Sequence, residues 1–149
     1  MEQKSAFDSF ELDINQDIKE YLNETSKWSH FLSILGFLGI GLMAIGGVGF
    51  SFYTGLNNFE GNTAYGLGYS AGIGLVYILL ALVYFFPVLY LFKFSKHMKT
   101  ALKLKNNKNL KSAFLNLKSH YKFMGIFTIV IISLYLLILV GVMTGAALF

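Results

Sequence analysis

Three long apolar runs without charge limit what this chain can fold into. Residues 31–59, 61–92 and 123–149 contain no lysine, arginine, histidine, aspartate or glutamate. Crossing the hydrocarbon core of a bilayer, about 30 Å thick, takes about 20 apolar residues in a helix. Soluble core helices of this length would carry charges on the face turned away from the core. The runs therefore predict an all-α membrane protein with three transmembrane helices, at about residues 31–53, 68–92 and 123–144.

The lysines predict the orientation of these helices. Nine of the twelve lysines lie in residues 93–122, a stretch that contains no acid. Short lysine-rich loops stay on the cytoplasmic side of a membrane. We therefore expect a basic cytoplasmic hairpin at residues 93–122 and an N-terminus inside the cell. The polar connection at residues 54–65 and the C-terminus are then expected outside.

Helical spacing continues into the basic hairpin, so we expect a cytoplasmic helical extension between the second and third transmembrane helices. One face of its first half carries Phe94, Met98, Ala101 and Leu102, and the other carries Lys96, Lys99 and Lys103. Three asparagines are expected to break this helix: Asn106, Asn107 and Asn109. A second amphipathic segment then leads into the third crossing. Pro87 lies inside the second crossing, where proline removes a backbone donor and predicts a kink.

The N-terminal stretch is acidic, with seven of the eight acids in the first 30 residues. We expect a flexible tail at residues 1–12 and an amphipathic helix at residues 13–30. The apolar face of that helix consists of Ile14, Ile18, Tyr21, Leu22, Thr25 and Trp28. It either lies in the membrane interface with Trp28 at headgroup depth, or packs on the protein's own hairpin. Because anionic lipid would repel its acidic polar face, the second hypothesis is favoured.

Small residues recur at spacing four in the second and third crossings. They predict helix-packing positions at Gly66, Gly68, Ser70, Gly72, Gly74, Gly141 and Gly145. Small residues let helix backbones approach closely where water cannot drive association. The spacing leaves open whether the contact forms within one chain or between chains.

The lysines of the hairpin also predict a partner. Lysines near a membrane surface are attracted to anionic lipid headgroups, and the residues expected to contact them are Lys93, Lys96, Lys99, Lys103, Lys118 and Lys122. Two other interpretations stay open: the lysines serve only as a topology signal, or they pair with the acidic N-terminal helix. Nucleic acid is not an expected partner, because basic and aromatic residues do not interleave as in a known binding module.

Three histidines, His30, His97 and His120, are expected at the cytoplasmic interface. Imidazoles at one depth are candidates for binding zinc or sensing pH, but no carboxylate at ligand spacing supports them. Interfacial polar anchoring is the favoured interpretation. The three crossings contain no ionisable acid, lysine or histidine, although intramembrane chemistry depends on such groups. We therefore predict no catalytic residue, metal site or cofactor.

Several stretches resemble an uncharacterised bacterial family of small integral membrane proteins, classed as a domain of unknown function. They are EYLNETSKW (20–28), GFLGIGLM (36–43), YFFPVLYLFKFSKHMKTAL (84–102) and LKSHYKFMGIFTI (117–129). The resemblance covers most of the chain beyond about residue 11. It implies three crossings and a bacterial cytoplasmic (inner) membrane, and it brings no active-site residue.

Two functions follow as hypotheses. The first is a non-enzymatic membrane protein that acts by association, as a homo-oligomer or as a small accessory subunit of a larger inner-membrane complex. The alternative is an oligomeric pore or carrier for a small or apolar solute. The residues closest to a polar stripe for such a path are Tyr69, Tyr77 and Tyr84, which lie near one face of the second crossing.

Overall fold

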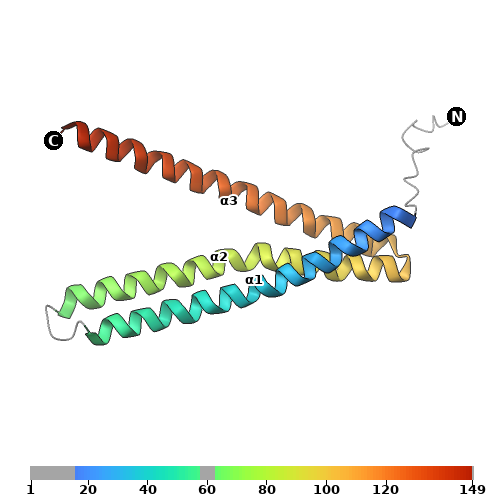
Figure 1. Ribbon diagram of the computed structural model, residues 1–149, viewed down its shortest axis with the longest axis horizontal. Helices are drawn as coiled ribbons and strands as arrows, with labels where there is room; N and C mark the ends of the chain where they lie inside the picture. Colours follow the sequence, from blue (N-terminus) through green and yellow to red (C-terminus); the bar gives the residue numbers. More distant parts are fainter. Residues whose placement is uncertain (1–15, 58–62, 149) are drawn as a thin grey trace.

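Three long helices make up the part of the chain that the computed structural model describes, which is residues 16–57 and 63–148. They are α1 (Gln16–Asn57), α2 (Thr63–Leu104) and α3 (Asn107–Leu148) (Figure 1). Each has 42 residues and, at about 1.5 Å per residue, is about twice as long as a hydrocarbon core is thick. All three are long and apolar enough to cross a membrane. The expected tail at residues 1–12 lies outside the described residues.

The expected N-terminal helix is not a separate element. Residues 16–30 are the first part of α1, which continues without a break to Asn57. The junction at residues 28–35 (WSHFLSIL) contains neither glycine nor proline, and extending an existing helix is easier than nucleating a new one. Residues 13–15 lie outside the part of the chain that the structure describes.

The expected polar connection at residues 54–65 is shorter than predicted, because both ends of it are helical. The Thr54 hydroxyl donates to the Phe50 carbonyl over 2.8 Å, and the Asn57 amide donates to the Tyr53 carbonyl over 2.8 Å. Polar side chains that bond to a carbonyl one turn earlier are compatible with a helix. α1 therefore continues to Asn57, and α2 begins at Thr63.

α1 and α2 form an antiparallel hairpin in constant register. Contacts run from Ser26 against Ser95 at one end to Gly47 against Tyr77 at the other. A Cβ added to Gly47 would lie 2.6 Å from Tyr77 Cβ, a distance that real Cβ atoms do not adopt. Glycine is therefore what lets the two helices approach this closely, as expected of packing between membrane helices.

A two-residue turn joins α2 to α3. Lys105 has a positive φ of 49°, and the Asn106 N–H donates to the Ala101 carbonyl over 3.1 Å, which is the closing bond of a Schellman motif. The Asn106 Oδ1 accepts from the N–H groups of Lys108 at 2.9 Å and Asn109 at 3.3 Å, so it caps α3. Asn106 thus breaks the helix as predicted, whereas Asn107 and Asn109, also expected to break it, belong to α3.

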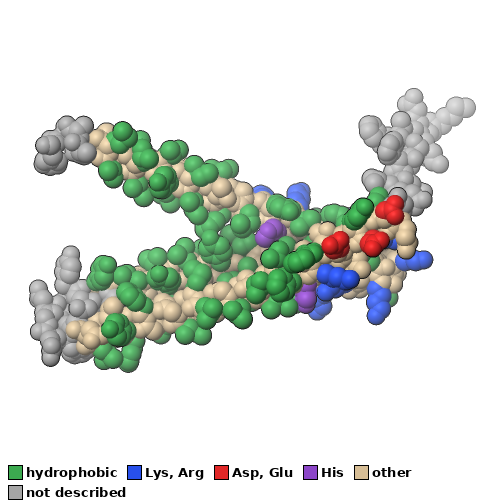
Figure 2. Space-filling view, in the orientation of Figure 1, with side chains coloured by type: hydrophobic (Ala, Val, Ile, Leu, Met, Phe, Trp, Pro, Cys, Tyr) green, Lys and Arg blue, Asp and Glu red, His purple; other side chains and the backbone are tan. Residues whose placement is uncertain are grey.

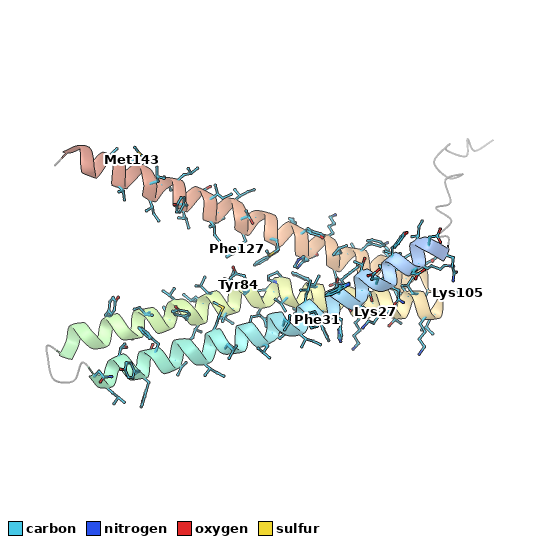
Figure 3. All side chains as sticks on the ribbon, viewed as in Figure 1. Lys27, Phe31, Tyr84, Lys105, Phe127 and Met143 are labelled. Carbon is cyan, nitrogen blue, oxygen red and sulfur yellow. The ribbon has the colours of Figure 1, made fainter. Side chains whose placement is uncertain are left out.

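α3 packs against α2 near this turn and then moves away from it (Figure 1). Toward the point of divergence, Tyr84 and Phe127 meet with their ring centroids 5.5 Å apart, and Figure 3 shows them facing each other across the base of the gap. Every residue from 128 to 144 is exposed. The apolar length of α3 is therefore left without a partner from the described part of the chain.

The buried core lies at the turn end of the molecule. It consists of Phe94, Met98 and Ala113, each no more than 1 % exposed. Partly buried leucines from all three helices surround it: Leu22, Leu91, Leu102, Leu110 and Leu117. The three helices are thus held together where the sequence is charged, and beyond Phe127 only α1 and α2 stay together in the described part of the chain.

Candidate functional site

The charged side chains gather at the turn end of the bundle. Figure 2 shows lysines and acids over this end and apolar side chains along both arms. The boundary between the charged and apolar zones lies at the same height on α1 and α2. The contact that shows this is the stacking of the His30 ring on the Phe92 ring, with centroids 5.4 Å apart. His30 directly precedes the first charge-free run, and Phe92 ends the second. The lysine-rich end of the bundle, where the α2–α3 turn lies, is therefore the candidate site.

A serine seam fastens α1 to α2 in this region. Ser26 and Ser95 are fully buried, and the Ser95 hydroxyl donates to the Ser26 carbonyl over 2.8 Å. The Ser26 hydroxyl and His30 Nδ1 are buried without a hydrogen-bond partner. Ser29 and Ser33 are buried on the same side of α1. This seam was not predicted from the sequence, although Ser26, Ser29 and Ser33 recur at spacings of three and four.

The seam corrects the apolar face predicted for residues 13–30. Leu22 belongs to the packed side, but Tyr21 is 67 % exposed and Trp28 is 60 % exposed. The serines replace these large side chains at the contact because a close backbone approach leaves room only for small residues. Ile14 lies outside the described residues.

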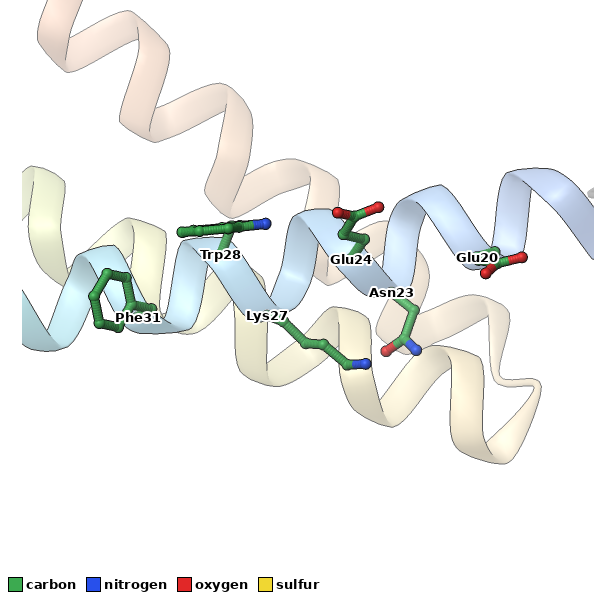
Figure 4. Close-up of a pocket in the computed structure, with 6 residues that line it drawn as sticks. All are labelled: Glu20, Asn23, Glu24, Lys27, Trp28 and Phe31. Atoms are coloured by element: carbon green, nitrogen blue, oxygen red, sulfur yellow. The ribbon is translucent and has the colours of Figure 1, made fainter.

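Trp28 instead lines a shallow hollow along α1. Figure 4 shows it running from Glu20 to Phe31, with Lys27 and Trp28 along its length. The Trp28 and Phe31 rings meet edge to face with centroids 6.0 Å apart. An aromatic pair at the charge boundary suits the headgroup depth of a membrane.

The three histidines have three different environments. His30 stacks on Phe92, while His97 lines a groove between α2 and α3. His120 Nδ1 lies 2.8 Å from the Pro87 carbonyl oxygen and so connects α3 to α2 at the proline. Among the described residues, no three histidine, cysteine or acidic side chains are placed to hold a metal ion.

The lysines predicted to contact lipid are all exposed, and they divide between two grooves and the surface of α3. Lys93 and Lys96 line the same α2–α3 groove as His97. Lys99 and Lys103 line a second groove, between α1 and α2, which also contains Glu20. The acidic and basic segments of the sequence therefore come together in the second groove. The remaining two lysines of the set are on α3: Lys118 and Lys122.

The predicted small-residue positions also divide. A Cβ added to Gly74 would clash with Ser51 and lie 3.1 Å from the Gly47 carbonyl oxygen, so Gly74 packs on α1 within one chain. No atom of the described residues lies within 4 Å of a Cβ added to Gly68, Gly72 or Gly141. Three other predicted positions belong to helices, but the structure does not describe their surroundings: Gly66, Ser70 and Gly145.

In the described part of the chain, these features define three helices that are all long and apolar enough to span a membrane and that are joined at a lysine-rich end. The chain belongs to the family described as "Family of unknown function (DUF5362)", which matches residues 50–143, more than half of its length. The match includes two of the stretches on which the resemblance was recognised, residues 84–102 and 117–129. No curated protein and no solved structure matches the chain.

Proposed function

We propose that this protein is a non-enzymatic integral membrane protein that acts by association, as a homo-oligomer or as a small accessory subunit of a larger membrane complex. One observation carries the proposal. The apolar length of α3 stands apart from α2 with residues 128–144 all exposed, and Gly72 and Gly141 have open space at their Cβ positions. Small residues on open faces allow another helix to approach closely.

The orientation is part of the proposal. The Lys105–Asn106 turn faces the cytoplasm, because short lysine-rich connections remain inside. The start of α1 lies on the same side, and the α1–α2 connection and the C-terminus lie outside. The resemblance to a bacterial family supports the bacterial inner membrane as the location.

Pore or carrier activity receives less support from the packing. Tyr77 lies against Gly47, and Tyr84 contacts Phe127. Two of the three tyrosines of the suggested polar stripe thus have packing partners within one chain. The side-chain packing therefore supports association more directly than a path for solute.

Native purification tests the proposal. The protein is extracted from its own membrane in mild detergent, and its stoichiometry and co-purifying chains are determined. We expect an assembly larger than one chain. Recovery of an isolated monomer under conditions that keep other membrane complexes intact would contradict association.

Two glycine variants separate contacts between chains from contacts within one. Gly72→Leu changes an open position, so we expect a smaller assembly with unchanged thermal stability of the single chain. Gly74→Leu inserts a side chain against α1, so we expect a less stable single chain. Unchanged assembly size in Gly72→Leu would show that this face is not the contact.

A further inference from the structure

We propose that the groove between α2 and α3 at the lysine-rich end is a binding site for one anionic phospholipid. The groove has a volume of about 550 Å³ and is open at the surface of the protein. Its α2 wall consists of Leu89, Phe92, Lys93, Lys96 and His97. Its α3 wall consists of Ser112, Leu115 and Asn116.

The order of side chains along α2 matches the order of chemical groups in a phospholipid. Leu89 and Phe92 lie within the charge-free run, and Lys93 and Lys96 follow it. The α2 lining residues recur at spacings of three and four, so they form one stripe of the helix. From Leu89 to His97 the stripe rises by eight residue steps and is about 12 Å long, enough to pass from the edge of the hydrocarbon core through the headgroup region. Acyl carbons would lie against the first part and the phosphate against the second.

The charge of the groove favours an anion. Its titratable lining residues are Lys93, Lys96 and His97, all of them bases. By contrast, the hollow on α1 contains Glu20 and Glu24, and the α1–α2 groove contains Glu20 beside its lysines. Among these three hollows at the basic end, the α2–α3 groove is the one whose charges all attract a phosphate.

Two side chains of the walls, Phe92 and Asn116, are already held by contacts within the protein. Phe92 is held between two rings of α1, by stacking on His30 and by an edge contact with Phe37 at 5.9 Å. The Asn116 amide donates to the Ser112 carbonyl over 2.8 Å. This bond uses one of the two N–H groups of the amide, and the lysines are the charged donors available to a phosphate. A prearranged site lowers the entropy lost on binding.

Lipid retention in the gas phase tests the site. Purified protein in neutral detergent receives phosphatidylglycerol or phosphatidylcholine at equal concentration, and native mass spectrometry counts the bound lipids. Two double variants remove the same amount of charge: Lys93→Gln/Lys96→Gln in the groove, and Lys105→Gln/Lys108→Gln at the turn outside it. At roughly fivefold per lysine, we expect the groove variant to bind phosphatidylglycerol about 30-fold more weakly. The control variant should bind like the original protein.

Further arms separate a lipid from a free anion. Leu115→Ser alters the apolar wall without changing charge and should also weaken phosphatidylglycerol binding. Glycerol phosphate at the same concentration should not displace the lipid. Equal weakening in the two lysine variants would indicate diffuse attraction and overturn the site. Equal binding of phosphatidylcholine, full retention by Leu115→Ser, or displacement by glycerol phosphate would also overturn it.

Discussion

At the scale of single residues, small side chains decide how closely the helices approach. The Ser95 hydroxyl bonds to a backbone carbonyl of α1, and Gly47 lets Tyr77 reach the backbone of α1. The two sites differ in what they contribute. Glycine removes a steric barrier, whereas serine adds a hydrogen bond between segments far apart in the sequence.

Ser26 and Ser95, which meet at the hydrogen bond of the seam, give a matched pair of variants. Ser95→Ala removes the bond to the Ser26 carbonyl, and interhelical hydrogen bonds in membranes average about 0.6 kcal/mol. Ser26→Ala removes a buried hydroxyl that has no partner, so stability should stay the same or rise. Thermal unfolding in detergent should therefore show a lower midpoint for Ser95→Ala than for Ser26→Ala. The reverse order would refute the bond.

At the scale of elements, α2 is the helix on which the other two depend. Its contacts with α1 run along most of the hairpin, and its contacts with α3 are confined to the turn end. The Pro87 carbonyl and the Tyr84 ring hold α3 through His120 and Phe127. Beyond Phe127, lipid or another protein helix must cover α3.

Variants along α3 test where its support ends. Phe127→Ala removes the ring contacts with Tyr84 and Phe123, and an aromatic pair contributes about 0.5–1.5 kcal/mol beyond area burial. Leu137→Ala changes a side chain that is 69 % exposed and should leave the stability of the single chain unchanged. Unfolding midpoints measured on monomeric protein in detergent compare the two. An equal loss for Leu137→Ala would mean that α3 packs along its full length.

Sequence patterns predicted the helices better than their contacts. The length of a charge-free run shows directly whether a helix can cross a membrane. The asparagines at residues 106–109 indicated a break in the helix, and Asn106 caps α3 there. Hydrophobicity could not predict which face of α1 packs on α2. Trp28 is more hydrophobic than Ser26, yet Trp28 is exposed and Ser26 is buried. The separation of α3 from α2 beyond Phe127 is a feature of the tertiary structure. The periodicity of α3 does not predict where its contacts with α2 end.

At the scale of the whole molecule, the proposed topology has three crossings with the lysine-rich turn inside the cell. Positive charge, the helical core and the proposed lipid groove all lie at that one end. The opposite end presents apolar helices with an open gap between α3 and the α1–α2 hairpin. Orientation therefore decides which leaflet supplies the lipid and on which side partners would dock.

Single-cysteine labelling measures that orientation directly, since the chain contains no native cysteine. Asn57→Cys, Lys108→Cys and Gln16→Cys are exposed positions at the two ends of the bundle. A membrane-impermeant maleimide should label Asn57→Cys in intact cells, and the other two only after the membrane is permeabilised. Labelling of Lys108→Cys in intact cells, with Asn57→Cys protected, would contradict the topology on which the account depends.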